Sequence, residues 1–308
     1  MTKATVYCVI VTYNGEQWIR KCLSSLVNSS LLPHIYVVDN GSTDNTVSII
    51  QQEYPQVELN LSPDNLGFGQ ANNKGMLAAL DRDADYVLLL NQDAWVEADT
   101  IENLITIHQQ NTGYGILSPV HVNASHTAID HNFSSYIVPR HCPDLYSDLY
   151  FNKLRDVYEC DFVNAAAWLI SKECLQTVGL FDKVFFHYGE DRNYCQRLLF
   201  HKLRIGVCPG LTVVHDREER KGVTEAFLGV KERIRIYLVK LADINDDTFE
   251  KAYSKLVSRH LYNLIKTKLK GKSKEYAYHS ELYKFLKSKK AEIIQSRQNN
   301  KKKYLQAN

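Results

Sequence analysis

The fold of this chain is decided by residues 86–96, which read Tyr86-Val87-Leu88-Leu89-Leu90-Asn91-Gln92-Asp93-Ala94-Trp95-Val96. A short apolar run flanked by polar residues is typical of a strand that is buried on both faces of a sheet. Ligands of an open α/β sheet bind beyond the carboxyl ends of its strands. We therefore expect Asp93 to lie at the rim of a crevice. A strand that merely ends in a polar turn would give the same pattern, so the other segments decide.

Those other segments alternate between strand and helix patterns. Apolar runs at 6–11, 35–38 and 57–61 are each followed by helical spacing of apolar residues, and a further helix is predicted over 100–110. This alternation predicts an α/β fold with a mostly parallel sheet and helices on both faces. Three of the strands end in polar side chains, at Asn14, Asp39 and Asp93, and these ends should converge on one edge of the sheet.

Composition sets the broad class of the protein. The 308 residues are 44% hydrophobic and 23% charged, which is typical of a globular protein with ample core. No apolar run approaches the roughly 20 residues that span a bilayer, and the N-terminus shows no secretory signal pattern. Seven scattered cysteines without a C-x-x-C pair indicate neither a disulfide framework nor a zinc cluster. We expect a cytoplasmic protein with free thiols.

Some cofactor classes are excluded by spacing. The pair Gly67 and Gly69 invites a dinucleotide interpretation, but Asn72 occupies the third glycine position and the stretch follows the third strand instead of the first. There is no phosphate-binding loop of the G-x-x-x-x-G-K-[ST] type. Residues 119–159 are irregular, and their histidines fit no metal-ligand spacing, so we interpret these as solvated loop residues. They are His121, His126, His131 and His141.

Two segments in the second half carry residues suited to chemistry. The run 162–170 combines small side chains with one large ring, Trp168, which either stacks on a ligand or fills the core. Glu190 and Asp191 follow an aromatic cluster at the start of a predicted helix. Acids in a first helical turn are favoured by the helix dipole, and acids at a cleft edge can act as a general base. Both alternatives stay open on the pattern alone.

Taken together, six motifs resemble the family 2 glycosyltransferases with the GT-A fold, particularly their bacterial rhamnosyltransferase-like branch. The resemblance covers about residues 5–220. It implies a Rossmann-like, mixed but mainly parallel sheet with helices on both faces, within a catalytic domain over 1–222 that is followed by C-terminal helices. The motifs are Val11-Thr12-Tyr13-Asn14, Val38-Asp39-Asn40-Gly41-Ser42-Thr43-Asp44, Asn65-Leu66-Gly67-Phe68-Gly69 with Asn72, Leu90-Asn91-Gln92-Asp93, Gly189-Glu190-Asp191 and His215.

The resemblance implies that the first strand ends bind a nucleotide-diphosphate sugar. The run Thr12-Tyr13-Asn14 would line the nucleoside pocket. Asp39 would accept a hydrogen bond from a pyrimidine ring nitrogen, a role that suits a carboxylate. Asn72 and the backbone around Gly67 would approach the diphosphate or the ribose.

The resemblance also implies a metal site. The run Asn91-Gln92-Asp93 occupies the D-x-D position, where a carboxylate binds a divalent cation that bridges the two phosphates. Mg²⁺ or Mn²⁺ is the expected ion, because hard cations prefer oxygen ligands. His215 matches a position that supplies a further metal or phosphate contact. Asn91 stands where the first carboxylate is expected, so the site carries less negative charge than the motif usually provides.

For catalysis, the resemblance assigns the general base to Asp191, which would take the proton of an acceptor hydroxyl during in-line, inverting displacement. Glu190 would orient the acceptor or Asp191. Trp168 would form part of the acceptor wall, and Arg197, about one helical turn further on, would pair with these acids.

The C-terminal third has its own pattern. Residues 223–265 are predicted to form a helical extension, and residues 266–308 a basic helical or partly disordered tail with 13 Lys/Arg against 3 Glu. A basic amphipathic helix suits an anionic membrane surface, although a solvated tail is an equal alternative. No nucleic-acid motif accompanies the charge, so we expect no nucleic-acid partner.

The sequence thus predicts an inverting glycosyltransferase of bacterial surface-polysaccharide synthesis. Its donor would be a UDP- or dTDP-sugar, with dTDP-rhamnose among the candidates, and its acceptor a glycan or a lipid-linked hydroxyl. It would be cytoplasmic or peripheral on the cytoplasmic face of the inner membrane, and its oligomeric state is open. The alternatives are a catalytically silent nucleotide-sugar-binding homologue and a sugar nucleotidyltransferase. The nucleotidyltransferase should have a glycine-rich basic loop after strand one, which the residues after Thr12 do not provide.

Overall fold

The computed structural model describes residues 4–216 and 229–307. Its strands are β1 (Val6–Thr12), β2 (His34–Asp39), β3 (Glu58–Leu61), β4 (Tyr86–Asn91), β5 (Ala94–Val96), β6 (Tyr114–Val122), β7 (Tyr158–Cys160), β8 (Ala167–Ser171) and β9 (Arg204–His215). Its helices are α1 (Ile19–Val27), α2 (Thr46–Glu53), α3 (Phe68–Asp81), α4 (Thr100–Gln110), α5 (His131–Ser134), α6 (Leu145–Tyr150), α7 (Lys172–Val178), α8 (Glu190–Phe200), α9 (Val230–Ala242), α10 (Phe249–Leu269), α11 (Ser273–Asn300) and α12 (Tyr304–Ala307).

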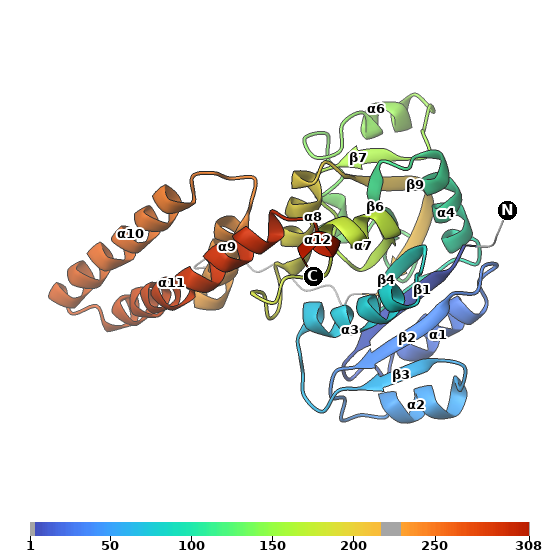
Figure 1. The fold of residues 1–308 in the computed structure, drawn as a ribbon, viewed down its shortest axis with the longest axis horizontal. Coiled ribbons are helices and arrows are strands. Elements are labelled where there is room, and N and C mark those ends of the chain that lie inside the picture. The colour runs from blue at the N-terminus through green and yellow to red at the C-terminus, as the bar shows by residue number, and fades with distance from the viewer. Residues whose placement is uncertain (1–3, 217–228, 308) are drawn as a thin grey trace.

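All strands of the described chain join one sheet in the order β3-β2-β1-β4-β8-β6-β9-β5, and β7 pairs with β9 beside this path (Figure 1). The pairs β1–β2, β1–β4 and β2–β3 are parallel, as the alternating pattern predicts. Beyond β4 the sheet is mixed, because β8 is antiparallel to both β4 and β6, whereas β6 and β9 are parallel. The predicted α/β class with a mixed sheet is confirmed.

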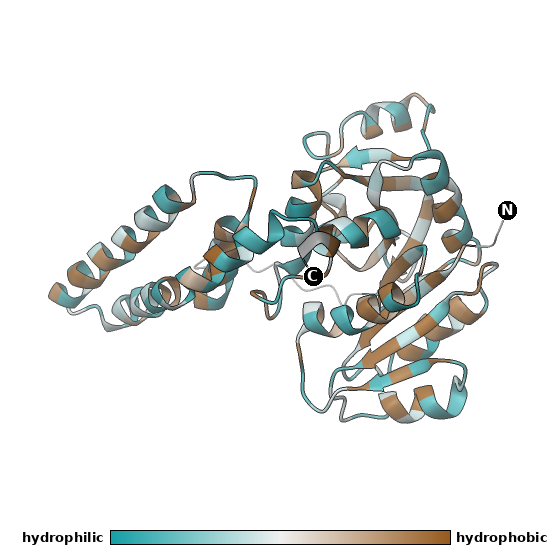
Figure 2. Ribbon diagram, viewed as in Figure 1, coloured by the Kyte–Doolittle hydropathy of each residue, from teal (hydrophilic) through white to brown (hydrophobic). Residues whose placement is uncertain are grey.

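Strand β4 is buried on both faces, which explains its continuous apolar run. Val87 and Leu89 point into one core, while Leu88 and Leu90 point into the other. Helices α3, α7 and α8 contribute to the first core, and α1, α2 and α4 to the second. Figure 2 shows the apolar colouring of the strands between these helical layers. The double burial of β4 fixes the strand end that carries Asn91 and Asp93.

Strand β9 joins two short apolar runs of the sequence, 204–208 and 211–214. It is one strand whose pairing with β6 shifts between Cys208 and Thr212. Pro209 lies at the shift and has no N–H for the ladder, so a local bulge is the expected result. The strand continues past the bulge to His215, which pairs with Ala94 of β5.

The C-terminal helices form a bundle in which α10 and α11 make a long hairpin that extends away from the sheet (Figure 1). The predicted boundary at 222/223 lies outside the described residues. The predicted boundary at 265/266 falls inside α10, which runs unbroken to Leu269. The predicted tail packs as part of this bundle, because Leu282, Leu286 and Ile293 of α11 are buried with residues of α9 and α10. No helix of the described chain is long and apolar enough to cross a membrane.

The far end of α11 is bonded to the part of the chain that contains the sheet. Ser296 and Asn300 both donate hydrogen bonds to the Asp182 carboxylate. The ring of Tyr304 in α12 packs on Gly179, where an added Cβ would meet the ring at 2.3 Å. The bundle is therefore attached at one end and projects at the other.

Candidate active site

A cavity of about 610 Å³ opens at the carboxyl ends of β1, β2 and β4, where the sequence predicts a binding crevice. A cavity of this volume is large enough for a nucleotide sugar. It is lined by Val11, Tyr13, Trp18, Asn40, Asn65, Gly67, Phe68, Asn91, Gln92, Asp93, Asn164, Ala165, Ala166, His187, Tyr188, Glu190, Asp191, His215 and Asp216.

The Gln92 side chain, which follows β4, forms hydrogen bonds to the end of β1. The Thr12 hydroxyl and the Tyr13 N–H both donate to Gln92 Oε1, at 2.7 and 3.0 Å. Gln92 Nε2 donates in turn to the Tyr13 carbonyl at 3.2 Å. Thr12 is fully buried, so its role is to orient Gln92. Tyr13 is half exposed and lines the cavity.

Asn14 joins the first strand end to the turn after β2. Its N–H donates to Ser42 Oγ at 2.9 Å, and its side-chain oxygen accepts from the Thr43 N–H at 2.8 Å. Asn14 has a positive φ of 49° and does not line the cavity. Asn14 thus has a structural role between these two segments, and its contact with a nucleoside stays a prediction.

Asp39 is buried at the end of β2, next to the cavity-lining Asn40. Its Oδ2 accepts from the N–H groups of Gly41 and Ser42, at 3.2 and 3.0 Å. Its Oδ1 is buried and accepts no hydrogen bond from any residue in 4–216 or 229–307. An unpaired buried acceptor is costly, so this oxygen fits a ligand that brings an N–H donor.

Gly67 brings two distant segments together at the start of α3. It has a φ of +77°, and a Cβ at this position would meet the Phe186 carbonyl at 1.9 Å. Only glycine permits this approach, so Gly67 sets the position of the loop that precedes α8. Asn72 is buried in α3 and donates to the Phe68 carbonyl at 3.0 Å. It does not line the cavity, so its approach to the diphosphate stays a prediction.

The antiparallel pairing of β5 with β9 places Asp93 and His215 side by side. Asp93 Oδ1 lies 3.5 Å from His215 Nε2, and the Asn91 amide nitrogen lies 3.5 Å from the same ring atom. On the other side of the ring, Asp130 Oδ2 lies 3.7 Å from Nδ1. A carboxylate and an imidazole this close can share one divalent cation, whose other ligands would be phosphate or water oxygens. Within the described ranges no set of three acidic, His or Cys side chains converges as a metal site.

The two acids of α8 lie at its first turn, after Gly189 with φ +100°. Glu190 is only 4% exposed, and its Oε2 has no hydrogen-bond partner within the described chain. Burial, and then the charge of Asp191, raises the pKa of Glu190 to about 7. Burial also raises the pKa of Asp191, although the Arg192 N–H and the charges of Arg192 and Arg235 oppose this. Both carboxyls therefore bind a proton more readily than in water.

Comparison with known proteins identifies the family. Residues 7–170, more than half of the chain, match the family described as Glycosyl transferase family 2. The chain belongs to glycosyl transferase family 2.

Curated relatives of this family 2 chain are named as hexosyl- or rhamnosyltransferases. The low-salt glycan biosynthesis hexosyltransferase Agl10 of Haloferax volcanii is 27% identical over 219 residues, which cover 68% of this chain and 66% of the relative. The dTDP-rhamnosyl transferase RfbF of Shigella flexneri is 24% identical over 214 residues, 69% of each chain. The N-acetylglucosaminyl-diphospho-decaprenol L-rhamnosyltransferase of Mycobacterium tuberculosis is 26% identical over 218 residues, 62% of this chain and 69% of the relative. The match to the Haloferax relative spans just under two thirds of its length.

Solved structures establish the GT-A fold of this family 2 chain. TarS 1–349 of S. aureus in complex with UDP-GlcNAc has a TM-score of 0.57 at 15% identity, covering 96% of this chain and 90% of that one. GalNAc-T7 with UDP, GalNAc and Mn²⁺ has a TM-score of 0.61 at 14% identity, covering 96% and 58%. The mannosyltransferase PcManGT from Pyrobaculum calidifontis, with GDP-Man and Mn²⁺, has a TM-score of 0.53 at 16% identity, covering 94% and 88%.

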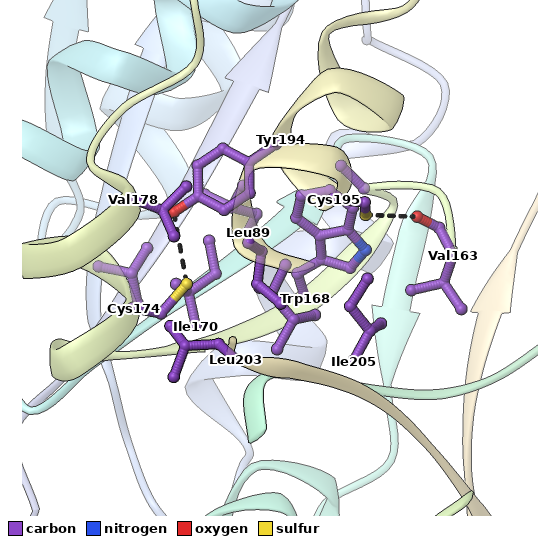
Figure 3. Packing of buried hydrophobic residues seen from close by; sticks show 14 of the residues in the cluster. Leu89, Val163, Trp168, Ile170, Cys174, Val178, Tyr194, Cys195, Leu203 and Ile205 are labelled. Carbon is purple, nitrogen blue, oxygen red and sulfur yellow. Dashed lines mark hydrogen bonds between the residues drawn. The ribbon is translucent and has the colours of Figure 1, made fainter. Parts of the chain in front are cut away.

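In this family 2 chain Trp168 is a core residue. It is 0% exposed in β8 and stacks on Phe181 at 6.2 Å. Figure 3 shows its ring among Leu89, Ile205 and Cys195, on the side of the sheet that α8 covers. The predicted acceptor wall is therefore wrong for Trp168. Its neighbours Asn164, Ala165 and Ala166 line the cavity instead.

Arg197 is likewise structural. It is buried, and its guanidinium donates to the carbonyls of Val178 and Leu180 at 2.9 and 2.7 Å. It also donates to the side chains of Asn193 and Asn300. The predicted pairing with the acids of α8 is wrong, because Arg197 lies two turns along the helix and faces the chain segment after α7. The arginine whose charge reaches both acids is Arg235 of α9.

Several cavity residues were missed by the motif analysis. Asn40 and Asn65 lie inside quoted motifs, so their polar character at strand ends was a usable signal. Asp130 has no such signal, because it lies in the irregular segment 119–159 and approaches His215 only through the tertiary fold. His121 is buried and stacks on Phe133 at 4.4 Å, so the prediction of a solvated loop is wrong for it.

The raised pKa of Glu190 predicts a pH dependence of stability. A carboxyl whose pKa is raised on folding stabilises the folded state fully below its unfolded pKa, near 4.5, and this contribution is lost as pH rises through about 7. We therefore compare the unfolding free energy of Glu190→Gln with that of the native chain at pH 5 and at pH 8. The variant's value minus the native value should rise by up to about 3 kcal/mol between these two pH values. Urea unfolding of both proteins at the two pH values measures this. The exposed Glu97→Gln serves as the control, and an equal difference at both pH values would contradict the pKa shift.

Proposed function

We propose that this chain is an inverting glycosyltransferase that moves a sugar from a nucleotide-diphosphate donor to an acceptor hydroxyl. The observation that carries the proposal is that one cavity is lined by Asp93 and His215 together with Glu190 and Asp191. A diphosphate site and a pair of acids with raised pKa are the two parts that such a transfer requires. Family membership supports the same reaction class.

The donor would enter with its base toward Tyr13 and the unpaired Oδ1 of Asp39. A carboxylate oxygen at this position accepts the ring N–H of uracil or thymine, which favours a UDP- or dTDP-sugar. The diphosphate would lie between Gly67 and Asp93, at the ends of β4 and α3. The half-exposed Tyr13 offers a ring against which the base can pack.

Asp93 and His215 would hold a Mg²⁺ or Mn²⁺ ion, with Asn91 beside them. When bound, such a cation supplies positive charge to the departing diphosphate. Asp93 provides the carboxylate, and the Asp130 side chain next to Nδ1 orients the ring so that Nε2 faces the site. Structural neighbours solved with Mn²⁺ support this assignment.

Asp191 would act as the general base. As the acceptor oxygen forms its bond to the anomeric carbon, the bond from that carbon to the diphosphate oxygen breaks on the opposite face, and the hydroxyl proton passes to Asp191. Its raised pKa makes it a stronger base than an exposed aspartate. Glu190, with a pKa of about 7, would hold a proton for part of the time and orient Asp191 or the acceptor.

The acceptor is proposed to be a glycan or a lipid-linked hydroxyl in bacterial surface-polysaccharide synthesis, at the cytoplasmic face of the inner membrane. The relatives named as rhamnosyl transferases support dTDP-rhamnose as one donor to test. The Mycobacterium tuberculosis relative, named for an N-acetylglucosaminyl-diphospho-decaprenol, supports a lipid-linked acceptor.

A thermal-shift panel of UDP-, dTDP- and GDP-sugars, each with and without Mn²⁺, tests the donor and the cation. At a hundredfold excess over Kd, a ligand adds about 2.7 kcal/mol of stability, which corresponds to a shift of about 5 °C. We expect one donor to reach this shift only with Mn²⁺. Asp93→Asn should lose the Mn²⁺-dependent part, whereas Asp99→Asn, an exposed carboxylate nearby in sequence, should keep it. Stabilisation by none of the donors would overturn the proposed function.

A further inference from the structure

Helix α10 carries an apolar stripe that no described residue covers. The side chains of Leu261, Tyr262, Ile265 and Leu269 are 44, 64, 56 and 83% exposed. Residues spaced by three and four positions share one face of a helix. The opposite face of α10 packs on α9 and α11 through residues such as Tyr253, Leu256 and His260. The stripe therefore points away from the bundle.

Basic side chains surround this stripe. Residues 249–274 contain eight Lys or Arg and one Glu, which gives a net charge of +7, and no acidic residue lies between Glu250 and Glu275. The last turn of α10 and the start of α11 expose five lysines, and Lys272 pairs with Glu275 at 2.6 Å. These lysines are Lys266, Lys268, Lys270, Lys272 and Lys274.

Residues 261–274, here named the hairpin tip, lie at the end of the hairpin that is farthest from the sheet (Figure 1). Figure 2 shows apolar and hydrophilic residues alternating along α10 toward this end. The other end of the hairpin is bonded to the catalytic half through Asn300. A projecting tip can therefore contact an extended surface without burying the catalytic cavity.

We propose that the hairpin tip docks on an anionic lipid bilayer. Its apolar stripe would enter the boundary between headgroups and acyl chains, and the flanking lysines would contact lipid phosphates. Charge complementarity selects this occupant. A second copy of the chain would bring the same +7 face and repel it, and a nucleic acid offers no place for four exposed apolar side chains.

The predicted membrane contact covered residues 266–308, and the hairpin tip overlaps it only over residues 266–274. The apolar residues of α11 are used in the bundle, since Leu282, Leu286 and Ile293 are fully buried. They leave no apolar face for a membrane. The contact moves to the outer face of α10 and the turn that follows it. The inference rests on the proposed function and deepens it, because a lipid-linked acceptor would lie in the bilayer. Bilayer binding itself requires neither donor nor transfer.

Co-sedimentation of the full chain with vesicles tests the docking. Vesicles of phosphatidylcholine alone are compared with vesicles that contain about 30 mol% phosphatidylglycerol, at about 0.1 and 0.5 M salt. We expect binding to the anionic vesicles only, and weaker binding at high salt. Each lysine lost should weaken binding about fivefold, so the double variant Lys266→Gln/Lys268→Gln should bind roughly 25-fold more weakly. Ile265→Ser/Leu269→Ser should lose binding as well.

A matched control is available in α6, where Leu149 and Tyr150 are 59 and 83% exposed beside Asp144 and Asp148. Leu149→Ser/Tyr150→Ser should bind anionic vesicles as the native chain does. The docking would be overturned by equal binding to both vesicle types or by no binding at all. It would also be overturned if only the α6 variant lost binding. A dimer that Ile265→Ser/Leu269→Ser dissociates, without vesicle binding, would overturn it too.

The hairpin variants are also tested for donor-induced thermal stabilisation, because no residue of the hairpin tip lines the cavity. Retained stabilisation with lost vesicle binding supports the docking. If no donor stabilises the native chain, the proposed function is overturned and the docking is not affected.

Discussion

Asp191→Asn is expected to lower kcat for sugar transfer by about 10²–10⁴-fold, because an amide cannot accept the acceptor proton. Donor binding should stay within about twofold of the native value, since the proposed diphosphate site lies at Asp93 and His215 and does not use Asp191. Initial rates of transfer give kcat, and calorimetric titration of the donor gives Kd. In the native chain the transfer rate should rise with pH through a pKa above the usual range of aspartate, in accord with the burial of this carboxyl.

Two companion variants separate a base from a general loss of charge. Asp161→Asn removes an exposed carboxylate that pairs with His141 at 2.8 Å and should leave kcat unchanged. Glu190→Gln should lower kcat less than Asp191→Asn does, because a glutamine amide can still hydrogen-bond a neighbour and the proposed base is left in place. If Asp191→Asn retained native kcat while Glu190→Gln lost it, the base would be Glu190.

Trp168→Ala is expected to cost about 3–5 kcal/mol of unfolding free energy, the range for removing a large ring from a packed core. The ring is fully buried and lies against Phe181 and Tyr194, so its loss leaves a cavity that the sheet cannot fill. Urea unfolding followed by far-ultraviolet circular dichroism measures the effect. Trp168→Phe should cost less, because most of the contact area remains.

The partly exposed Trp95 is the matched control for this loss. Its ring lies under the Lys21 ammonium at 4.9 Å and outside the cores, so Trp95→Ala should cost no more than about 1 kcal/mol. Below the unfolding transition, Trp168→Ala should keep the native KM for the acceptor. Native stability together with a raised acceptor KM would restore Trp168 to the acceptor wall.

The parts of the fold that depend on local pattern could be predicted from the sequence. Continuous apolar runs gave β1, β2 and β4, because a strand buried on both faces has no polar side to interrupt it. The polar residues named after these runs were Asn14, Asp39 and Asp93. Asp93 lines the cavity, whereas at the other two strand ends the lining residues are the neighbours Tyr13 and Asn40. Parallel pairing forces such strand ends to one edge whatever the loops between them do.

Other assignments failed because they depend on distant contacts. A tryptophan among small residues has the same sequence signature whether it faces a ligand or a core, and the placement of Trp168 is settled by α8 packing over β8. Arg197 was assigned to nearby acids by helical spacing, but its partners are backbone carbonyls and Asn300. Asp130 approaches His215 across the sheet edge, so no local pattern could reveal it.

The hairpin has a further consequence, through the length of one helix. Helix α11 has 28 residues, begins at the lysine-rich turn and ends at Asn300, which is bonded to Asp182. At 1.5 Å per residue this rigid element is about 42 Å long. With the hairpin tip on a bilayer, the length of α11 would limit the distance between the lipid surface and the cavity. An acceptor would then be selected by how far its hydroxyl stands from its lipid, and shortening α11 by two turns would lower that reach by about 11 Å.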